Sequence, residues 1–257
     1  MSDPTRRELG DFLRSRRERL TPAAIGMPPG RRRRTAGLRR EEVAERAGIG
    51  VDWYIRLEQG RSVTPSATTV DALARALCLG AVEHAHLRAL ARAPDARRFV
   101  RETVPATVRR VIDALHLPAY VTGRRWDVLA WNDAAAEIFG FDRLPEADRN
   151  TLICVLTNPH ARRLFGDGWA EEAKRMVEQF RATHDLWAGD PAFLDLLARL
   201  RAGCAEFQGW WEAHDVRNVA AGQKALTHPR HGVVRFDYVT FQANDDPALK
   251  LAIYTPA

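Results

Sequence analysis

Apolar residues recur every three to four positions through the first third of the chain, a spacing typical of amphipathic helices. Residues 5–20 place Leu9, Phe12 and Leu13 on one face, and Thr21 and Pro22 end this helix. A loop rich in proline and glycine follows, over residues 21–38. The same period predicts four more helices, over about 40–47, 51–59, 66–78 and 82–92. Ser66 is the expected N-cap of the third of these.

After Pro94 and Asp95 the pattern changes to a mixture of helices and strands. Alternating apolar and polar residues predict a hairpin within residues 119–131 and three later strands, over 222–227, 232–242 and 249–254. Helices are expected over 105–116, 133–139 (capped by Asn132), 168–183 and 191–202. The predicted fold class is an all-α domain over residues 1–94, a linker over 95–104 and an α+β domain over 105–257.

The composition of the 257 residues is that of a globular protein, with 46% apolar and 28% charged residues. Every apolar run falls far short of the ~20 residues that cross a bilayer, and the first residues lack the apolar core of a signal peptide. The three cysteines are widely spaced and form no CxxC pair. These features predict a cytoplasmic protein with reduced thiols and no membrane partner.

Charge is distributed unevenly along the chain. Residues 1–110 contain 23 arginines and 13 acidic residues, a balance of +10, although the whole chain carries only +6. The remaining residues therefore carry −4. A basic first part joined to a mildly acidic remainder predicts a module that binds a polyanion, followed by a second domain.

Residues 38–60 carry the most informative motif, two short helices joined by a tight turn. Gly48 can take the positive φ that ends the first helix, and Ala44 is small where the two helices must approach. Tyr54 and Leu57 form the inner face of the second helix. Its outer face then consists of Val51, Asp52, Ile55 and Arg56, whose leading end is free to enter a major groove.

Over residues 6–92 this arrangement resembles the helix-turn-helix domain of phage-repressor-like (XRE/Cro) transcription regulators. The resemblance rests on the Ala-xxx-Gly spacing, the Arg-Leu-Glu-Gln-Gly exit and the two helices that follow Pro65. The loop at 21–38 is a departure, because simple members have only a few residues there. The resemblance implies a homodimer that binds a double-stranded DNA operator.

The resemblance also implies roles for individual residues. Val51, Asp52 and Arg56 take positions from which family members contact base edges. Arg40 takes a position that touches phosphate or an outer base, and Arg61 a position next to phosphate. Glu58 is expected to pair with Arg17 of the first helix and so to hold the second helix of the motif in place.

The run Arg31, Arg32, Arg33 and Arg34 leaves two interpretations open. It is either a solvated charge run or an arm that reaches the DNA backbone or minor groove, where arginine is favoured. Six to ten phosphate contacts cost about 10³–10⁵ in affinity between 50 and 200 mM salt. If the run is an arm, its deletion is expected to flatten the salt dependence of DNA binding. An unchanged slope in a filter-binding titration would assign the run to solvent.

The second part of the chain resembles the ligand-binding domain of MmyB-like regulators over residues 105–256. The resemblance is carried, in order, by Leu-Ala-Trp-Asn at 129–132, Asp-Arg-Asn at 148–150, Asp-Pro at 190–191, Glu-Phe at 206–207, Trp211, His-Asp-Val-Arg at 214–217 and His-Pro at 228–229 with Gly232. It implies a PAS-like fold and a small apolar effector, with a fatty acid as the expected class.

Candidate effector-binding residues are Trp131, Trp211, His214, Arg217 and Tyr238. The tryptophans could enclose an apolar cavity or simply form the core. His214 and Arg217, expected one helical turn apart, could face one carboxylate or brace the sheet. We expect a regulator, more readily a repressor than an activator, with no cofactor and no metal.

Two alternative functions stay open. A metal site of His214, His228 and His231 would indicate a metal sensor or an enzyme, although GxSxG, HExxH, GxGxxG and P-loop motifs are absent from the sequence. A redox sensor would use Cys78, Cys154 or Cys204, but their apolar neighbours predict inert core thiols.

Overall fold

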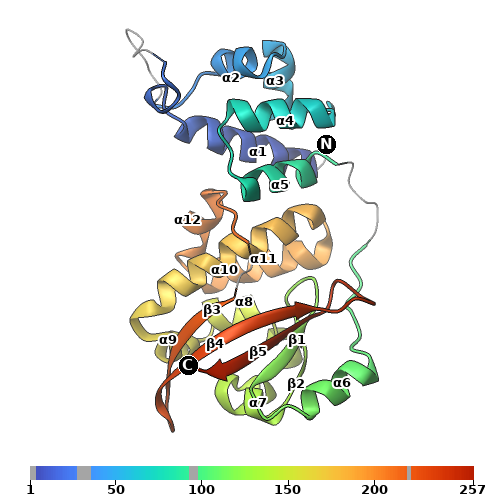
Figure 1. Cartoon of the computed structure of the whole chain (residues 1–257), viewed down its shortest axis with the longest axis vertical. Coiled ribbons are helices and arrows are strands. Elements are labelled where there is room, and N and C mark those ends of the chain that lie inside the picture. Colours follow the sequence, from blue (N-terminus) through green and yellow to red (C-terminus); the bar gives the residue numbers. More distant parts are fainter. Residues whose placement is uncertain (1–3, 28–35, 93–97, 219–220) are drawn as a thin grey trace. The chain divides into compact units, whose positions relative to one another are not determined.

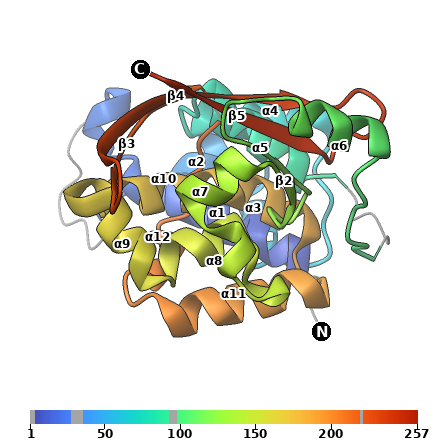
Figure 2. The same cartoon turned by 90° about the horizontal axis from the view of Figure 1, so that it is seen from below.

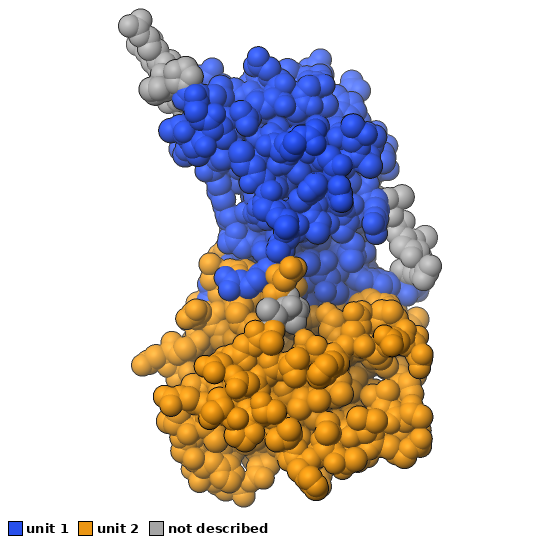
Figure 3. Space-filling view, viewed as in Figure 1, with its two compact units in different colours: residues 1–98, 180–194, 210–217 blue, residues 99–179, 195–209, 218–257 orange. Residues whose placement is uncertain are grey.

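The computed structural model describes residues 4–27, 36–92, 98–218 and 221–257, so Arg31–Arg34 and the predicted boundary at Pro94–Asp95 lie outside the described residues (Figure 1). The chain forms two compact units (Figure 3). Unit 1 comprises residues 1–98, 180–194 and 210–217, and unit 2 comprises residues 99–179, 195–209 and 218–257. Two segments from the predicted second domain therefore pack as part of the first unit.

The N-terminal part of unit 1 is helical, as the apolar spacing predicts (Figure 1). Its elements are α1 (Pro4–Arg19), η1 (Ala23–Ile25), α2 (Arg40–Ala47), α3 (Val51–Glu58), α4 (Ala67–Ala76) and α5 (Ala81–Leu90). Helix α1 contacts α3 and α5, and α2 contacts α3 and α4. Their apolar faces meet in one core, which includes Leu9, Phe12, Leu13, Val43, Ala44, Tyr54, Leu57, Leu73 and Leu87.

Residues next to the helices determine the end of α2 and the start of α4. Gly48 follows α2 at φ 65° and its N–H bonds back to Ala44 and Glu45, and the Ser66 hydroxyl accepts the Thr69 N–H at the start of α4. Cys78 corrects the prediction of a buried thiol. Helix α4 ends at Ala76, and Cys78 is an exposed residue with φ 54°.

Unit 2 is built on one antiparallel sheet. Its strands are β1 (Ala119–Thr122), β2 (Val128–Trp131), β3 (Gly222–His228), β4 (Gly232–Gln242) and β5 (Lys250–Pro256). The strand order is β2-β1-β5-β4-β3, so the early hairpin joins the three late strands through β5. The register sets Tyr238 opposite Tyr254, and Tyr120 opposite Ala252, on the same face of the sheet.

Helices lie on both faces of this sheet (Figure 2). On the inner face, Ile138 of α7 (Asp133–Phe139) and Leu164 of α9 (Pro159–Phe165) pack against Leu226, Phe236 and Tyr254. On the opposite face, Ile112 of α6 (Ala106–Asp113) packs against β1. The helices are α6 (Ala106–Asp113), α7 (Asp133–Phe139), α8 (Thr151–Leu156), α9 (Pro159–Phe165), α10 (Trp169–His184), α11 (Pro191–Gly203) and α12 (Phe207–Glu212), with 3-10 turns η2 (Phe141–Arg143), η3 (Glu146–Asp148), η4 (Gly166–Gly168) and η5 (Asp185–Trp187). The last turns of α10, η5 and parts of α11 and α12 belong to unit 1.

Buried asparagines hold the hairpin in place. Asn132 caps α7 through the Ala135 N–H, as predicted, and its amide also donates to the carbonyl oxygens of Leu115 and Leu117. Asn150 caps α8 and donates to the Asp127 carboxylate. Both asparagines therefore have structural roles. Among the described residues, no helix combines the length and apolarity that crossing a bilayer requires.

Candidate DNA-reading helix and ligand pocket

Helix α3 is amphipathic, with an exposed polar face and a buried apolar face. Tyr54 and Leu57 are buried in the core of unit 1, whereas Asp52 and Arg56, one turn apart, are exposed and Val51 beside them is half-buried. Of the three predicted base-contacting side chains, Asp52 and Arg56 share an outward edge, and Val51 packs against the core beside them. Arg61 is also exposed, just after the glycine that follows α3.

The predicted brace between α1 and α3 is confirmed. Arg17 donates from Nε and Nη2 to Glu58 Oε1 at 2.9 and 2.5 Å, and from Nη1 to the Leu38 carbonyl at 3.0 Å. The Glu58 side chain is fully buried. Arg40 binds the other Glu58 oxygen, so the predicted DNA contact of Arg40 would have to be shared with this ion cluster.

Gly10 also sets the position of α3. A Cβ atom at Gly10 would lie 2.5 Å from the Glu58 carbonyl oxygen, closer than van der Waals contact allows. Only glycine therefore lets α1 pass the end of α3 at this distance. Sequence reasoning did not single out this residue, because one glycine within a helical pattern gives no indication of what it faces.

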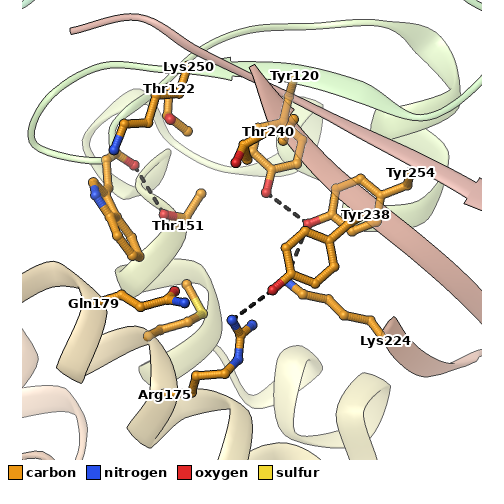
Figure 4. Close-up of a pocket in the computed structure, with 13 residues that line it drawn as sticks. Tyr120, Thr122, Thr151, Arg175, Gln179, Lys224, Tyr238, Thr240, Lys250 and Tyr254 are labelled. Carbon is orange, nitrogen blue, oxygen red and sulfur yellow. Dashed lines mark hydrogen bonds between the residues drawn. The ribbon is translucent and has the colours of Figure 1, made fainter. Parts of the chain in front are cut away.

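Unit 2 contains a pocket between the inner face of the sheet and α10 (Figure 4). Strands β1, β3, β4 and β5 all contribute side chains, and α10 contributes the facing wall. The pocket is lined by Tyr120, Thr122, Trp126, Thr151, Arg175, Met176, Gln179, Lys224, Tyr238, Thr240, Lys250, Ala252 and Tyr254.

An ion cluster lies at one side of this pocket. Glu172 contacts Lys224 at 3.0 Å and Arg175 at 2.6 Å. Arg175 donates to the Tyr238 hydroxyl at 2.7 Å, and Lys224 donates to the Tyr254 hydroxyl at 3.2 Å (Figure 4). Burial alone would raise the pKa of Glu172, but Lys224 and Arg175 outweigh burial and hold that pKa below its usual range. Glu172 is therefore ionised.

Lys250 lines the same pocket without a comparable partner. No acidic group of the described residues lies within ion-pair distance of Lys250, and burial lowers its pKa from the usual value of a lysine. Arg175, Lys224 and Lys250 thus line the pocket, and Glu172 pairs with the first two of them. This excess of positive charge can stabilise an anion.

A second, mainly apolar cavity continues from the first. The two share Tyr120, Thr151, Met176, Lys224 and Tyr254. The second cavity is also lined by Phe139, Phe141, Leu144, Cys154, Val155, Asn158, His160, Ala161, Leu164 and Phe165. Together the two cavities offer a cationic end and an apolar end to one ligand.

Of the five predicted effector-binding residues, Tyr238 lines this pocket. Trp131, Trp211, His214 and Arg217 are not among its lining residues. The expected helical spacing of His214 and Arg217 is wrong, because α12 ends at Glu212 and His214 has φ 52°. The prediction failed there because the turn after α12 uses a left-handed non-glycine residue, which the sequence does not signal.

Lys224 and Lys250 were missed by sequence reasoning. A usable signal existed, because the chain contains only three lysines among its 39 basic residues, and two of the three line the pocket. Arginine is always charged and fork-shaped, whereas lysine is a compact charge that can lie in a partly apolar site. Lysine in an arginine-rich chain was therefore informative.

The thiol interpretation receives no support from two of the cysteines. Burial raises the pKa of Cys154 to about 12, and burial also raises the pKa of Cys204. Neither thiol is therefore activated as a thiolate. Cys78 is the exposed one, contrary to its predicted core position.

The histidines of the alternative metal triad have other partners. The rings of His228 and His231 stack 4.6 Å apart, and His231 contacts Glu137 at 2.9 Å. His214 Nδ1 lies 3.2 Å from Arg181 in unit 1.

A different set of possible metal ligands occurs in unit 1. Glu8, His184 and Asp185 place ligand atoms within 4.8 Å of one another. Arg181 already lies 3.4 Å from Glu8 and 3.7 Å from Asp185, so a guanidinium supplies the positive charge there. This set is therefore an ion-pair cluster.

The described residues thus include a braced helix with an outward polar edge and a unit with a charged and apolar pocket. Residues 104–257 match the model of the MmyB-like transcription regulator ligand binding domain, and residues 8–87 match that of a helix-turn-helix domain. The chain belongs to the MmyB-like transcription regulator family. Among curated proteins, none matches it.

Proposed function

We propose that this protein is a repressor that binds operator DNA as a homodimer through α3 and senses a fatty acid in the pocket of unit 2. The observation that carries the effector class is Lys250, a half-buried cation without a described acidic partner in a pocket that continues into an apolar cavity. A carboxylate with an alkyl chain satisfies both features at once.

The excess charge of the pocket argues for an anionic ligand over a neutral one. A buried charge without a partner is costly, and an incoming carboxylate removes that cost. Tyr120 and Tyr254 can add hydrogen bonds, because burial raises the pKa of both phenols and keeps them protonated. The apolar cavity beyond them then receives the alkyl chain and adds ~0.8 kcal/mol for each buried methylene.

The DNA-binding part of the proposal rests on the exposed edge of α3. Two such helices in a dimer would read half-sites whose centres lie about 10 base pairs, or a multiple, apart. Release of the operator by the effector requires that the fatty acid bind one arrangement of the dimer more tightly than the other.

The direct test is to sequence the genomic fragments that the purified protein retains and then titrate the best fragment in a mobility-shift assay. Saturated fatty acids from octanoate to palmitate are added, with the matching alcohols as uncharged controls. We expect a palindromic site that is released by the acids and not by the alcohols. Equal effects of acids and alcohols would contradict a carboxylate-binding pocket, and absence of any preferred fragment would contradict the regulator.

Replacing Lys250 by methionine is expected to weaken fatty-acid binding about ten- to a hundredfold, since a hydrogen bond to a charged group contributes ~1.5–3 kcal/mol. Lys174→Met is the matched control, because Lys174 is exposed and pairs with Glu178 outside the pocket. Isothermal titration of both variants measures the difference. Equal affinities would show that Lys250 does not contact the ligand.

The affinity of the unchanged protein for a fatty acid is also expected to depend on pH. The carboxylate and Lys250 are both charged near neutrality, so affinity falls as pH rises through the pKa of Lys250. Because burial lowers that pKa, the fall begins below the range of an ordinary lysine. Titrations from neutral to alkaline pH measure this, and Lys250→Met should remove the part of the fall that begins below the range of an ordinary lysine.

A further inference from the structure

The C-terminal part of α1 carries three arginines that serve two different contacts. Arg17 binds Glu58 at the end of α3. Arg16 and Arg19 instead bind Asp215, at 3.3 and 2.5 Å from its Oδ1 atom. Arg16 also donates to the His214 carbonyl, and Arg19 donates to the Ala213 carbonyl. Helix α1 therefore contacts the end of α3 through Arg17, and residues 213–215 through Arg16 and Arg19.

Burial and charge make the contact with residues 213–215 a defined one. The Arg16 side chain is only 7% exposed, and its Nε lies 3.0 Å from Glu83 of α5. Burial alone would raise the pKa of Asp215, but Arg19 and Arg16 hold that pKa below its usual value. Opposite charges thus meet where Arg16 is largely removed from water, so loss of the Asp215 charge takes one carboxylate away from two arginines.

A second contact in unit 1 supports the first. Arg181, which is 1% exposed, lies 3.4 Å from Glu8 of α1, and its guanidinium stacks 3.9 Å from the centre of the Trp211 ring. Asp185 contacts His86 of α5 at 3.1 Å. Burial and the nearby Arg181 lower the pKa of His214 to about 4, so its neutral ring can accept the Arg181 N–H.

We infer that residues 213–215, together with Arg181 and Asp185, form an intramolecular docking site that restrains α1 and through it the DNA-reading helix. The partner surface is the Arg16–Arg19 end of α1 with Glu8 and His86. The family match over 104–257 includes the docking site, so the sensing part of the chain directly contacts the helix that braces α3.

The docking site is joined to the effector pocket through short covalent connections. Helix α10 carries the pocket residue Arg175 and, less than two turns later, Arg181. Strand β3, which carries the pocket residue Lys224, begins shortly after Asp215. A shift of α10 or β3 on effector binding would therefore be felt at the docking site. This inference rests on the proposed function for its ligand, and on the ion pairs alone for the restraint.

The test compares the full chain with Asp215→Asn, which keeps the side-chain shape and removes the charge, and with Arg19→Ala. Arg7→Ala is the control, because Arg7 is an exposed residue of the same helix with no described ion pair. Hydrogen exchange of the backbone amides of α1 and α5 is measured without DNA or fatty acid. We expect exchange to be about tenfold faster in both variants, which is the factor expected for loss of one charge-assisted hydrogen bond. The control should exchange at the same rate as the unchanged protein.

The second measurement is operator affinity in a mobility-shift assay with and without palmitate. We expect both docking-site variants to lose most of the palmitate effect on DNA affinity while palmitate still binds. Unchanged exchange, or faster exchange with an unchanged palmitate effect, would overturn the inference. If palmitate has no effect on the unchanged protein, the proposed effector class is wrong. The exchange rates, together with the operator affinities of the variants without palmitate, then still test whether the docking site restrains α1.

Discussion

Replacing Arg17 by methionine is expected to lower the free energy of unfolding of unit 1 by about 3–5 kcal/mol, because a buried Glu58 carboxylate loses its main partner. Glu58 is fully buried, and Arg17 supplies two of its hydrogen bonds. The more exposed Arg40 and Arg14 would remain near that charge, Arg14 at 4.0 Å. The end of α3 would lose its restraint, so operator affinity should fall together with stability. Urea titration of the full chain followed by circular dichroism measures the change.

Two further variants make this prediction specific. Arg14→Met should cost much less, because Arg14 is 42% exposed and lies 4.0 Å from the same Glu58 oxygen. The double variant Arg17→Met, Glu58→Met should be more stable than Arg17→Met alone, since an apolar pair leaves no buried charge. If Arg14→Met and Arg17→Met are equally destabilised, the brace does not hold unit 1 together.

Replacing Arg56 by alanine is expected to reduce operator affinity by about 1–3 kcal/mol, five- to 150-fold, because arginine reads guanine through two hydrogen bonds. Arg56 is exposed on α3 and outside the apolar core, so stability should hardly change. Loss of base reading should also relax the sequence preference at one position of the selected site. Competition assays against single-base variants of the operator measure both effects.

Arg75→Ala is the control for this prediction. Arg75 is an exposed arginine in the last turn of α4, so its replacement removes the same charge from the same unit as the replacement of Arg56. It should weaken binding to all sequences by a similar small factor or leave it unchanged. Equal behaviour of the two variants would mean that Arg56 contributes only general electrostatic attraction and that another surface reads the operator.

Local sequence signals were sufficient for the helix-turn-helix. Gly48 at the turn and Ser66 at the start of α4 act over a few residues, so their roles can be read without knowing the fold. The Arg17–Glu58 pair followed from the family resemblance. The short helices α8, α9 and α12 were missed, because six or seven residues establish a helical period only weakly; the equally short α7 was predicted with the help of its Asn132 cap.

The pocket of unit 2 depends on contacts between residues that are distant in the sequence. Five of its lining residues come from five different elements: Tyr120, Arg175, Lys224, Tyr238 and Lys250. For the four strand residues among them, the strand register decides which side chains face α10. The predicted candidate Trp131 lies opposite Tyr120 and so on the same face of the sheet, but on the edge strand β2, where it does not line the pocket. Trp131 packs instead against Phe141 and Arg149.

The sequence by itself determined the helical motif, the outward edge of α3, the basic first part and the strands of the second part, because these depend on local periodicity and charge. Only the tertiary structure decided that Lys250 has no described acidic partner at the pocket and that Asp215 binds Arg16 and Arg19. Ion pairs and pockets join residues far apart in the chain, and their partners are fixed by packing that no local pattern records.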